Sequence, residues 1–390
     1  MLKLANRTKS MSPSVIREIL KVAKQPGMIS LAGGNPDPKT FPLDFIKTNI
    51  NTILEKYGTS LFQYGLTEGF EPLRISVANY LKTIGINIDS KSVFISTGAQ
   101  SAINAAATVL INKGDKIGVE APTFLGSINT FKIYEPEFIA LKTDEEGVIP
   151  EELLSTITKH KIRLIYLQPN FQNPTGHTLS NTRRMEIAEI IKTYDLIAIE
   201  DDPYHELNYT STSYKTLYEL APENVIYISS LSKIFSPGLR LGYYLGPSKI
   251  IEKMIPIKQG IDVHTDNFAQ ALATEYMDSQ FFLKNLQFIR TLYEHKSKIM
   301  TDSIANYFPT ELTVSKVLGG MFIWCRSNRV LDKKAIYTES IQKKVAYVPG
   351  ETFYVKPPAT FTMRLNFTNV DEQNIKLGIE TLGSILKRHI

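Results

Sequence analysis

The sequence predicts an α/β protein with a large domain, in which helices sandwich a mostly parallel sheet, and a smaller α+β domain. Two observations predict this class. From residue 92 to about residue 246, short apolar runs of β-forming residues alternate with longer stretches of helical periodicity. After a long helical region, the pattern then changes to a few strands and a closing helix. Strands that alternate with helices pair in parallel and are covered on both faces.

The individual elements follow from these patterns. In the large domain we expect strands at Val93–Ser96, Lys116–Glu120, Ile162–Leu167, Leu196–Glu200, Val225–Ser229 and Leu241–Leu245. Helices are expected at Gln100–Ile111, Asn181–Tyr194 and Lys249–Ile257. A long helical region is expected at Asn267–Ile304, and after it, in the small domain, we expect strands at Met321–Cys325, Ala346–Val348 and Thr362–Asn366 and a helix at Asp371–Lys387. Ligands of such sheets gather at the carboxyl ends of the strands.

Composition excludes several classes of function. The formal net charge is +5, from 44 Lys+Arg against 39 Asp+Glu, and no long basic run points to nucleic acid. No apolar run reaches the roughly 18 residues of a membrane span, and Met1–Ser10 is polar and basic, so we expect a cytoplasmic protein without membrane contact. The single cysteine, Cys325, excludes an internal disulfide and a cysteine-based zinc site. Because the six histidines show no HExxH spacing, we expect no metal.

The segment around Lys233 carries the strongest chemical signal. Ser230 and Ser232 flank the lysine, and Arg240 follows seven residues later. A lysine that condenses with an aldehyde near neutral pH must lose its proton, which requires a desolvated or cation-rich pocket. Hydroxyl groups and a guanidinium suit a phosphate. The segment therefore predicts a Schiff base to a phosphorylated aldehyde, and pyridoxal 5'-phosphate (PLP) fits that description.

Two further turns can be read as parts of the same ligand site. In Ser96–Ser101 a strand ends in a glycine turn and a helix begins, so free amides and the positive helix end form an anion site; an ordinary capped turn is the alternative. In Pro169–Gly176 the string Asn-Pro-Thr-Gly turns the chain sharply, and Asn173 could donate its amide to a phenolate oxygen. A purely structural turn is the alternative there.

An acidic strand end and an aromatic residue complete the set. Asp201 lies in Glu200–Tyr204, after an apolar strand, where a carboxylate would keep a pyridine nitrogen protonated and make the ring an electron sink. A helix cap is the alternative for this acidic segment. Phe124 follows the strand that ends at Glu120 and could stack on a cofactor ring, although a lone phenylalanine is more often part of a core.

Together these segments resemble the fold type I PLP-dependent aminotransferases of the class I/II branch, which includes 2-aminoadipate and kynurenine aminotransferases and the corresponding domain of MocR-type regulators. The 28-residue spacing from Asn173 to Asp201 also agrees with this family. The resemblance covers essentially the whole chain, with matching segments at Ile29–Pro38, Gln63–Gly69, Gly319–Trp324, Tyr347–Gly350 and Arg364–Phe367. On this basis we predict an N-terminal arm with part of the small domain over 1–44, a large PLP-binding domain over 45–285 and a C-terminal small domain over 286–390.

The resemblance implies a role for each matching cofactor residue. Lys233 would be the catalytic Schiff-base lysine, and Asp201 the partner of the pyridinium nitrogen. Asn173 and Tyr204 would bind the phenolic oxygen, and Phe124 would stack on the ring. The remaining cofactor contacts would hold the phosphate, and they are Ala99, Gln100, Ser230, Ser232, Arg240 and, from the neighbouring subunit, Tyr64. That last contact implies a homodimer with shared active sites, and Ala99 stands where the family often has serine, so a hydroxyl contact is lost.

The resemblance also implies the substrate contacts. Arg364 would clamp the α-carboxylate, helped by Asn173. Gly33 and Gly34 would let the N-terminal arm approach the substrate closely. Arg17 matches an arm arginine that meets a distal carboxylate in some relatives, and a solvated helix residue is the alternative.

The implied reaction is ping-pong transamination, in which Lys233 carries a proton between the substrate Cα and the cofactor. The donor would be an L-amino acid of aromatic, branched-chain or 2-aminoadipate type, and the acceptor a 2-oxo acid such as 2-oxoglutarate. A β-lyase or decarboxylase on the same fold is one alternative. A MocR-like regulatory domain is another, but only about thirty residues precede Ser30–Gly34, which we expect to be too few for a DNA-binding module.

Overall fold

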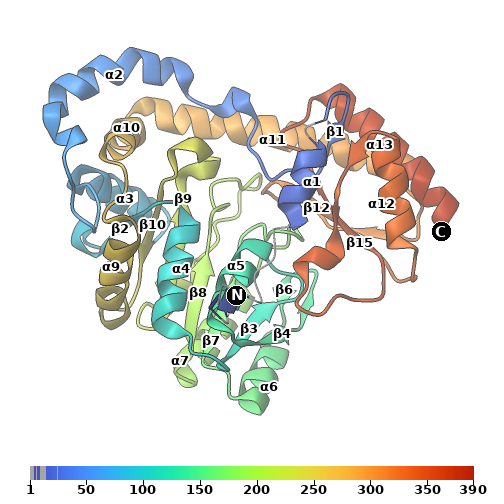
Figure 1. Ribbon diagram of the computed structural model, residues 1–390, viewed down its shortest axis with the longest axis horizontal. Helices are drawn as coiled ribbons and strands as arrows, with labels where there is room; N and C mark the ends of the chain where they lie inside the picture. Colours follow the sequence, from blue (N-terminus) through green and yellow to red (C-terminus); the bar gives the residue numbers. More distant parts are fainter. Residues whose placement is uncertain (1–3, 6, 9–14, 24) are drawn as a thin grey trace.

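The computed structural model describes residues 4–5, 7–8, 15–23 and 25–390. Its centre is a seven-stranded sheet with the strand order β2-β10-β9-β8-β7-β3-β4 (Figure 1). The strands are β2 (Phe94–Ser96), β3 (Lys116–Glu120), β4 (Glu137–Leu141), β7 (Leu164–Leu167), β8 (Ile197–Asp201), β9 (Val225–Ser230) and β10 (Gly242–Leu245). All neighbouring pairs are parallel except the two that involve β10. This sheet confirms the predicted α/β class.

Helices cover both faces of the large sheet because its strands are apolar on both sides. Along β7, Leu164 and Tyr166 pack into one core with α4 (Ala99–Leu110) and α9 (Ser248–Asp262). The alternate residues Ile165 and Leu167 pack into a second core with α6 (Pro150–His160) and α7 (Asn181–Thr193). Successive side chains of a strand point to opposite faces, so one apolar strand contributes to both cores.

The smaller unit contains a four-stranded antiparallel sheet with the order β11-β12-β15-β14. Its elements are β11 (Leu312–Val314), β12 (Phe322–Ser327), α12 (Lys333–Gln342), β14 (Val348–Pro349), β15 (Thr362–Asn366) and α13 (Glu372–His389). The expected strand Ala346–Val348 is wrong as a single element. The chain changes partner at Tyr347, since β13 (Val345–Ala346) pairs with β1 (Ile29–Ser30) and β14 pairs with β15.

The helical region expected from 267 to 304 is also divided. It forms α10 (Asn267–Met277) and α11 (Gln280–Tyr307), because Ser279 has extended backbone between them. Figure 1 shows α11 running from the large sheet towards the small one. The domain boundaries stay a prediction, and the one between residues 285 and 286 falls inside α11.

Five of the elements named above, β1, β4, α6, β11 and α12, were not predicted from the sequence, and neither were the remaining ones. They are α1 (Val15–Ala23), η2 (Pro38–Thr40), α2 (Leu43–Tyr57), η3 (Gly58–Phe62), α3 (Glu71–Thr83), η4 (Ser90–Ser92), α5 (Leu125–Phe131), η5 (Lys132–Tyr134), β5 (Thr143–Asp144), β6 (Gly147–Val148), α8 (Leu217–Leu220), η6 (Leu231–Lys233), η7 (Pro237–Leu239) and η8 (Gly350–Phe353). Among the described residues, no helix combines the length and the apolar character needed to cross a membrane.

Candidate active site

The parallel strands of the large sheet bring their carboxyl ends to one edge, and Lys233 lies there. It ends η6, the short helical turn that directly follows β9. Its Nζ donates a hydrogen bond to the carbonyl oxygen of Gly34, at 2.9 Å. The N-terminal arm thus meets the strand end although 199 residues separate the two partners. The sequence predicted both residues for the site, and the fold brings them into contact.

The surroundings of Lys233 favour its neutral form. Burial lowers the pKa of its amine to about 8, and the positive charges of Arg364 and Arg240 act in the same direction. A lysine with this pKa is partly deprotonated at neutral pH, whereas an ordinary lysine is almost entirely protonated. Lys233 is therefore prepared to attack an aldehyde and to carry a proton.

Asp201 ends β8 and is buried with one oxygen unsatisfied. Its Oδ2 accepts hydrogen bonds from the hydroxyl of Tyr166 and from Nε2 of Gln168, at 2.7 Å for the latter. Its Oδ1 is buried and has no partner in the described chain. Burial raises the pKa of Asp201 to about 6, so the carboxylate is still mostly ionised at pH 7. A buried carboxylate oxygen without a donor fits a ligand that supplies an N–H group.

Gln168 connects the strand ends to one another, and sequence reasoning missed it. Its backbone N–H donates to Oε2 of Glu120, at 2.9 Å, and its Oε1 accepts the backbone N–H of Asn173, at 3.1 Å. Burial raises the pKa of Glu120 to about 8. The signal that could have found Gln168 is its position, since it is the first polar residue after the apolar strand β7. Tyr166, within that strand, gave no such signal.

Arg364 enters the site from β15 of the small sheet. Its Nη1 donates to Oδ1 of Asn173 and its Nη2 to the carbonyl oxygen of Ala32, both at 2.7 Å. Its Nε is buried without a partner in the described chain, and burial lowers the pKa of the guanidinium to about 10. The guanidinium carbon lies 4.3 Å from the ring centroid of Phe322 and 4.9 Å from that of Phe353. Two rings and two hydrogen bonds thus fix a cation whose free N–H group requires an acceptor.

Tyr204 and Arg364 both contact the ring of Phe322. Tyr204 is buried, and its ring stands edge-on to Phe322 with 6.0 Å between the centroids. Burial raises the pKa of its hydroxyl, and a side-chain hydrogen bond with Asn173 opposes this shift. Tyr204 therefore stays protonated and can donate a hydrogen bond, as its predicted role requires.

The predicted phosphate residues gather where α4 begins. Gly98 has φ 79° and ψ 162°, and a Cβ atom there would lie 2.5 Å from Nη2 of Arg240. A Cβ atom on Gly242 would lie 2.7 Å from the backbone nitrogen of Ala99. The Arg240 guanidinium therefore lies directly against the turn whose free N–H groups begin the helix.

Two serines and a glutamine complete this region. The Ser230 hydroxyl accepts the backbone N–H of Ser232, at 3.1 Å, and donates to the carbonyl of Leu241, at 3.3 Å. The Gln100 side chain is turned away, because its Nε2 donates to Thr130 and to the Gly126 carbonyl on α5. Gln100 can therefore donate to an anion at this turn only through its backbone N–H. Its side chain connects α4 to α5.

The four other predicted residues lie at different places in the chain. The Phe124 ring lies over Gly126, since a Cβ atom there would lie 2.4 Å from its Cζ. Tyr64 is 81% exposed, edge-on to the His264 ring at 5.9 Å, and the described hydrogen bonds do not join it to Lys233. Gly33 is buried in the arm beside Gly34. Arg17 belongs to α1, but its side chain lies outside the described residues.

The residues present fit PLP at each of its polar groups. The turn before α4 and Arg240 offer donors for a phosphate, Lys233 offers an amine for the aldehyde, and the unpaired oxygen of Asp201 offers an acceptor for the ring N–H. The unpaired Nε of Arg364 is left for a substrate carboxylate.

Comparisons with known proteins agree with this geometry. A family model described as aminotransferase class I and II matches residues 26–382. The chain is 37% identical to aromatic-amino-acid aminotransferase 1 of Thermococcus litoralis, over 97% of this chain and 93% of that protein. It is 33% identical to 2-aminoadipate transaminase of Thermus thermophilus, over 96% and 94%. The solved structure of Pyrococcus horikoshii kynurenine aminotransferase in complex with PMP superposes with a TM-score of 0.94 at 38% identity, covering 99% of this chain and 97% of that one.

Proposed function

The chain belongs to the class I and II aminotransferases and depends on PLP, and from this premise we propose that it transfers the amino group of an aromatic L-amino acid to a 2-oxo acid such as 2-oxoglutarate. One observation carries the proposal. Two buried polar atoms near Lys233 lack partners, the acceptor Oδ1 of Asp201 and the donor Nε of Arg364. A protonated pyridine ring satisfies the first, and an amino-acid carboxylate satisfies the second.

The preference for an aromatic donor is supported by the environment of Arg364. Its guanidinium lies against the rings of Phe322 and Phe353, and Trp324 is its direct partner across the β12–β15 ladder. Trp324 and Phe353 in turn stand edge-on at 6.0 Å. Three aromatic side chains beside the carboxylate clamp favour an aromatic substrate side chain. Relatives named for aromatic amino acids and for kynurenine point in the same direction.

The side chains of this protein divide the work of the reaction. PLP bound here supplies an electron sink for the negative charge that proton removal leaves on Cα. Asp201 keeps the ring nitrogen protonated through Oδ1, while Tyr166 and Gln168 hold its other oxygen. Arg364 and Asn173 orient the carboxylate. Lys233 would accept the Cα proton of the bound amino acid at Nζ and later give it up, because a pKa of about 8 suits both accepting and donating a proton near neutral pH.

A homodimer with shared active sites is part of the proposal. Phe62, Tyr64 and Leu66 lie on one segment and are 73%, 81% and 65% exposed in the single chain. Large apolar side chains so close together favour a contact with another chain. Covered by a second copy, Tyr64 would reach the phosphate of the neighbouring site. The expectation of a cytoplasmic location stays a prediction.

The test is a panel of amino donors with 2-oxoglutarate. We expect phenylalanine, tyrosine and kynurenine to be converted faster than leucine, and leucine faster than aspartate, as measured by the glutamate formed. Fastest conversion of 2-aminoadipate or of a branched-chain donor would overturn the aromatic preference and leave amino transfer intact. Release of ammonia or carbon dioxide without glutamate would instead support the lyase or decarboxylase alternative.

Lys233→Ala tests the assignment of the catalytic residue. Loss of Lys233 removes both the proton carrier and the covalent anchor, so we expect turnover to fall by more than the roughly 10² to 10⁴-fold of general base catalysis alone. The measurement is glutamate formation by the dialysed variant. Full activity of that variant would contradict the role of Lys233.

A further inference from the structure

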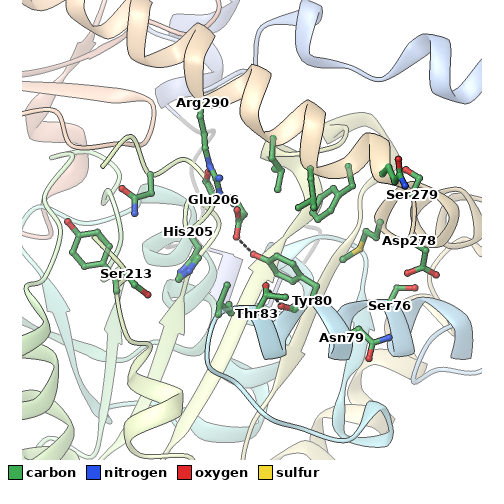
Figure 2. A pocket seen from close by; sticks show the side chains of 18 of the residues that line it. Ser76, Asn79, Tyr80, Thr83, His205, Glu206, Ser213, Asp278, Ser279 and Arg290 are labelled. Atoms are coloured by element: carbon green, nitrogen blue, oxygen red, sulfur yellow. Dashed lines mark hydrogen bonds and ion pairs between the residues drawn. The ribbon is translucent and has the colours of Figure 1, made fainter. Parts of the chain in front are cut away.

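A cavity of about 700 Å³ lies apart from the residues proposed to bind PLP, none of which lines it (Figure 2). Its walls come from α3, from the loop of residues 205–214, from the connection between α10 and α11, and from the first turns of α11. Figure 2 shows Glu206 between Arg290 and Tyr80, with His205 beside it. A cavity of this size is sufficient for a small organic ligand.

Two side chains of this cavity, those of Arg290 and His205, keep donor groups open, while Asp278 adds a carboxylate to the lining. Both oxygens of Glu206 are occupied, by the Tyr80 hydroxyl and by Nη2 of Arg290, and Nε of Arg290 donates to the Glu206 carbonyl at 2.7 Å. No hydrogen bond in the described chain uses Nη1 of Arg290, whose side chain is 33% exposed. His205 contacts Oδ2 of Asp202 through Nδ1, at 3.0 Å. Among the described residues, none forms a hydrogen bond with its Nε2.

The charges around these donors favour a ligand with one negative charge. Burial opposes protonation of His205, but the charge and hydrogen bond of Asp202 outweigh it and raise the pKa of His205. Arg290 and His205 each already face one carboxylate, Glu206 and Asp202 respectively. A carboxylate, which carries one negative charge, can accept hydrogen bonds from Nη1 of Arg290 and from Nε2 of His205, and the guanidinium makes the first of these bonds charge-assisted.

Apolar side chains line the cavity beside these donors, on α11 itself and at the ends of α3 and α10. They belong to Ile84, Met277, Phe282, Leu283 and Leu286. Phe282 and Leu286 belong to the main core, while Leu283 is 70% exposed at the edge. A ligand that fills the cavity therefore places an apolar body against the first two turns of α11 and an anionic group towards His205 and Arg290, which lies further along the same helix.

We propose that this cavity is an effector site for a small organic monocarboxylate with an apolar body. The route to the active site is short, since His205 binds Asp202 and Asp202 follows Asp201 in the chain. Asp202 also accepts hydrogen bonds from Asn170, at 2.8 Å, and from Tyr227, at 3.1 Å. A carboxylate on Nε2 of His205 draws the imidazolium charge away from Asp202, which changes the electrostatic field at Asp201. The effect on Asp201, unlike the binding itself, rests on the proposed function.

Binding can be measured on the holoenzyme with a label at the edge of the cavity. Cys325 is the only cysteine and is fully buried, so Leu283→Cys can be labelled selectively with a trifluoromethyl group. We expect phenylacetate to shift the ¹⁹F resonance saturably, and phenylacetamide, which has the same shape without the charge, to leave it unchanged. An equal response to phenylacetamide, or no saturable shift, would overturn the proposal. If sulfate shifts the resonance as much as phenylacetate does, the cavity binds anions without selecting an organic body, and the proposal of an organic monocarboxylate is overturned.

Three further variants locate the bound ligand. Asn79 is exposed on α3 and lines the cavity, so Asn79→Trp should block it and abolish the shift without disturbing the core. His205→Gln should weaken the apparent affinity about tenfold, because it removes a charged donor. The matched control is His295→Gln, which removes an exposed histidine paired with Glu372 at 3.1 Å outside the cavity, and should change nothing. A shift that persists in Asn79→Trp would place the ligand elsewhere and overturn the proposal.

The effector role is tested through the absorbance of the bound PLP. Phenylacetate should change its pH titration in the wild type, and Asn79→Trp should remove that part of the change that arises at the cavity. Binding without any difference between the two proteins would overturn the effector role. If the protein fails to bind PLP, the proposed function fails, while the ¹⁹F result still decides whether the cavity binds the carboxylate.

Discussion

At the scale of single residues, the chemistry of this site depends on burial more than on residue type. Lys233, Asp201 and Arg364 are an ordinary lysine, aspartate and arginine in the sequence, yet burial moves the pKa of each, to about 8, about 6 and about 10. Asp201 and Arg364 also keep one unsatisfied atom each. These properties make the three side chains reactive towards a cofactor and a substrate.

The pKa of Lys233 predicts how fast the apoprotein combines with PLP. The neutral amine is the nucleophile, so the rate should rise about tenfold per pH unit below about pH 8 and level off above it. At pH 7 about one tenth of Lys233 is neutral, against about one in three thousand for an ordinary lysine. The measurement is stopped-flow absorbance after mixing apoprotein with PLP. A lysine peptide is the control, and a rate that rises to pH 10 in both would contradict the shifted pKa.

Arg364→Lys tests the carboxylate clamp. Lysine cannot reproduce the planar fork that contacts Asn173 and Ala32, nor offer an N–H group at the position of Nε. The variant should raise KM for the amino donor at least about tenfold, the loss of about 1.4 kcal/mol, with a smaller effect on kcat. Steady-state kinetics give both values. A variant in which kcat falls and KM stays constant would assign Arg364 to the chemical step instead.

At the scale of elements, the site is built where turns connect strands to helices. The start of α4 is such a turn, and its geometry depends on Gly98, whose φ of 79° and ψ of 162° are essentially restricted to glycine. The helix end and Arg240, which we propose as phosphate donors, lie together because the backbones approach closely at Gly98 and Gly242. Short loops between rigid elements thus carry the binding groups.

Gly98→Ala should weaken PLP binding at least about tenfold, because the new Cβ would displace Arg240. It should also cost roughly 1–3 kcal/mol of stability through backbone strain. The control is Gly114→Ala, where φ is 83° but no atom lies within 4 Å of the new Cβ. This control should lose stability and keep its PLP affinity, as measured by PLP titration and thermal unfolding. Equal PLP affinity in both variants would contradict the phosphate role of this turn.

At the scale of the whole molecule, we propose a homodimer in which Tyr64 would complete the phosphate site of the neighbouring subunit. Leu66→Asp introduces a charge into the exposed apolar segment around Tyr64, so it should shift the mass in solution from twice 44.0 kDa to 44.0 kDa and weaken PLP binding. Light scattering measures the mass. Val330→Asp is the control, since Val330 is 73% exposed but lies between β12 and α12. A monomeric wild type, or a Leu66→Asp dimer with unchanged PLP affinity, would contradict the shared site.

Six of the seven strands of the large sheet, all except β4, and the turns at their ends could be predicted because local patterns encode them. Apolar runs of four to six residues and their polar ends identified β3, β7, β8 and β9 to within a few residues. The direction of β10 could not be predicted, since its residues fit a parallel or an antiparallel neighbour equally well. Likewise, the break at Ser279 and the change of partner at Tyr347 depend on what packs beside them.

The residue types at the strand ends, in their order along the chain, indicated the cofactor, and the family resemblance that they carry implied the kind of reaction. What only the folded chain decides is which of these groups touch. Lys233 meets Gly34 across 199 residues, and Arg364 meets Asn173 across 191. Gln168, the unpaired atoms of Asp201 and Arg364, and the cavity beside His205 likewise arise only from packing. The physical reason is that burial and unsatisfied hydrogen bonds are properties of distant segments in contact, which local sequence preferences do not encode.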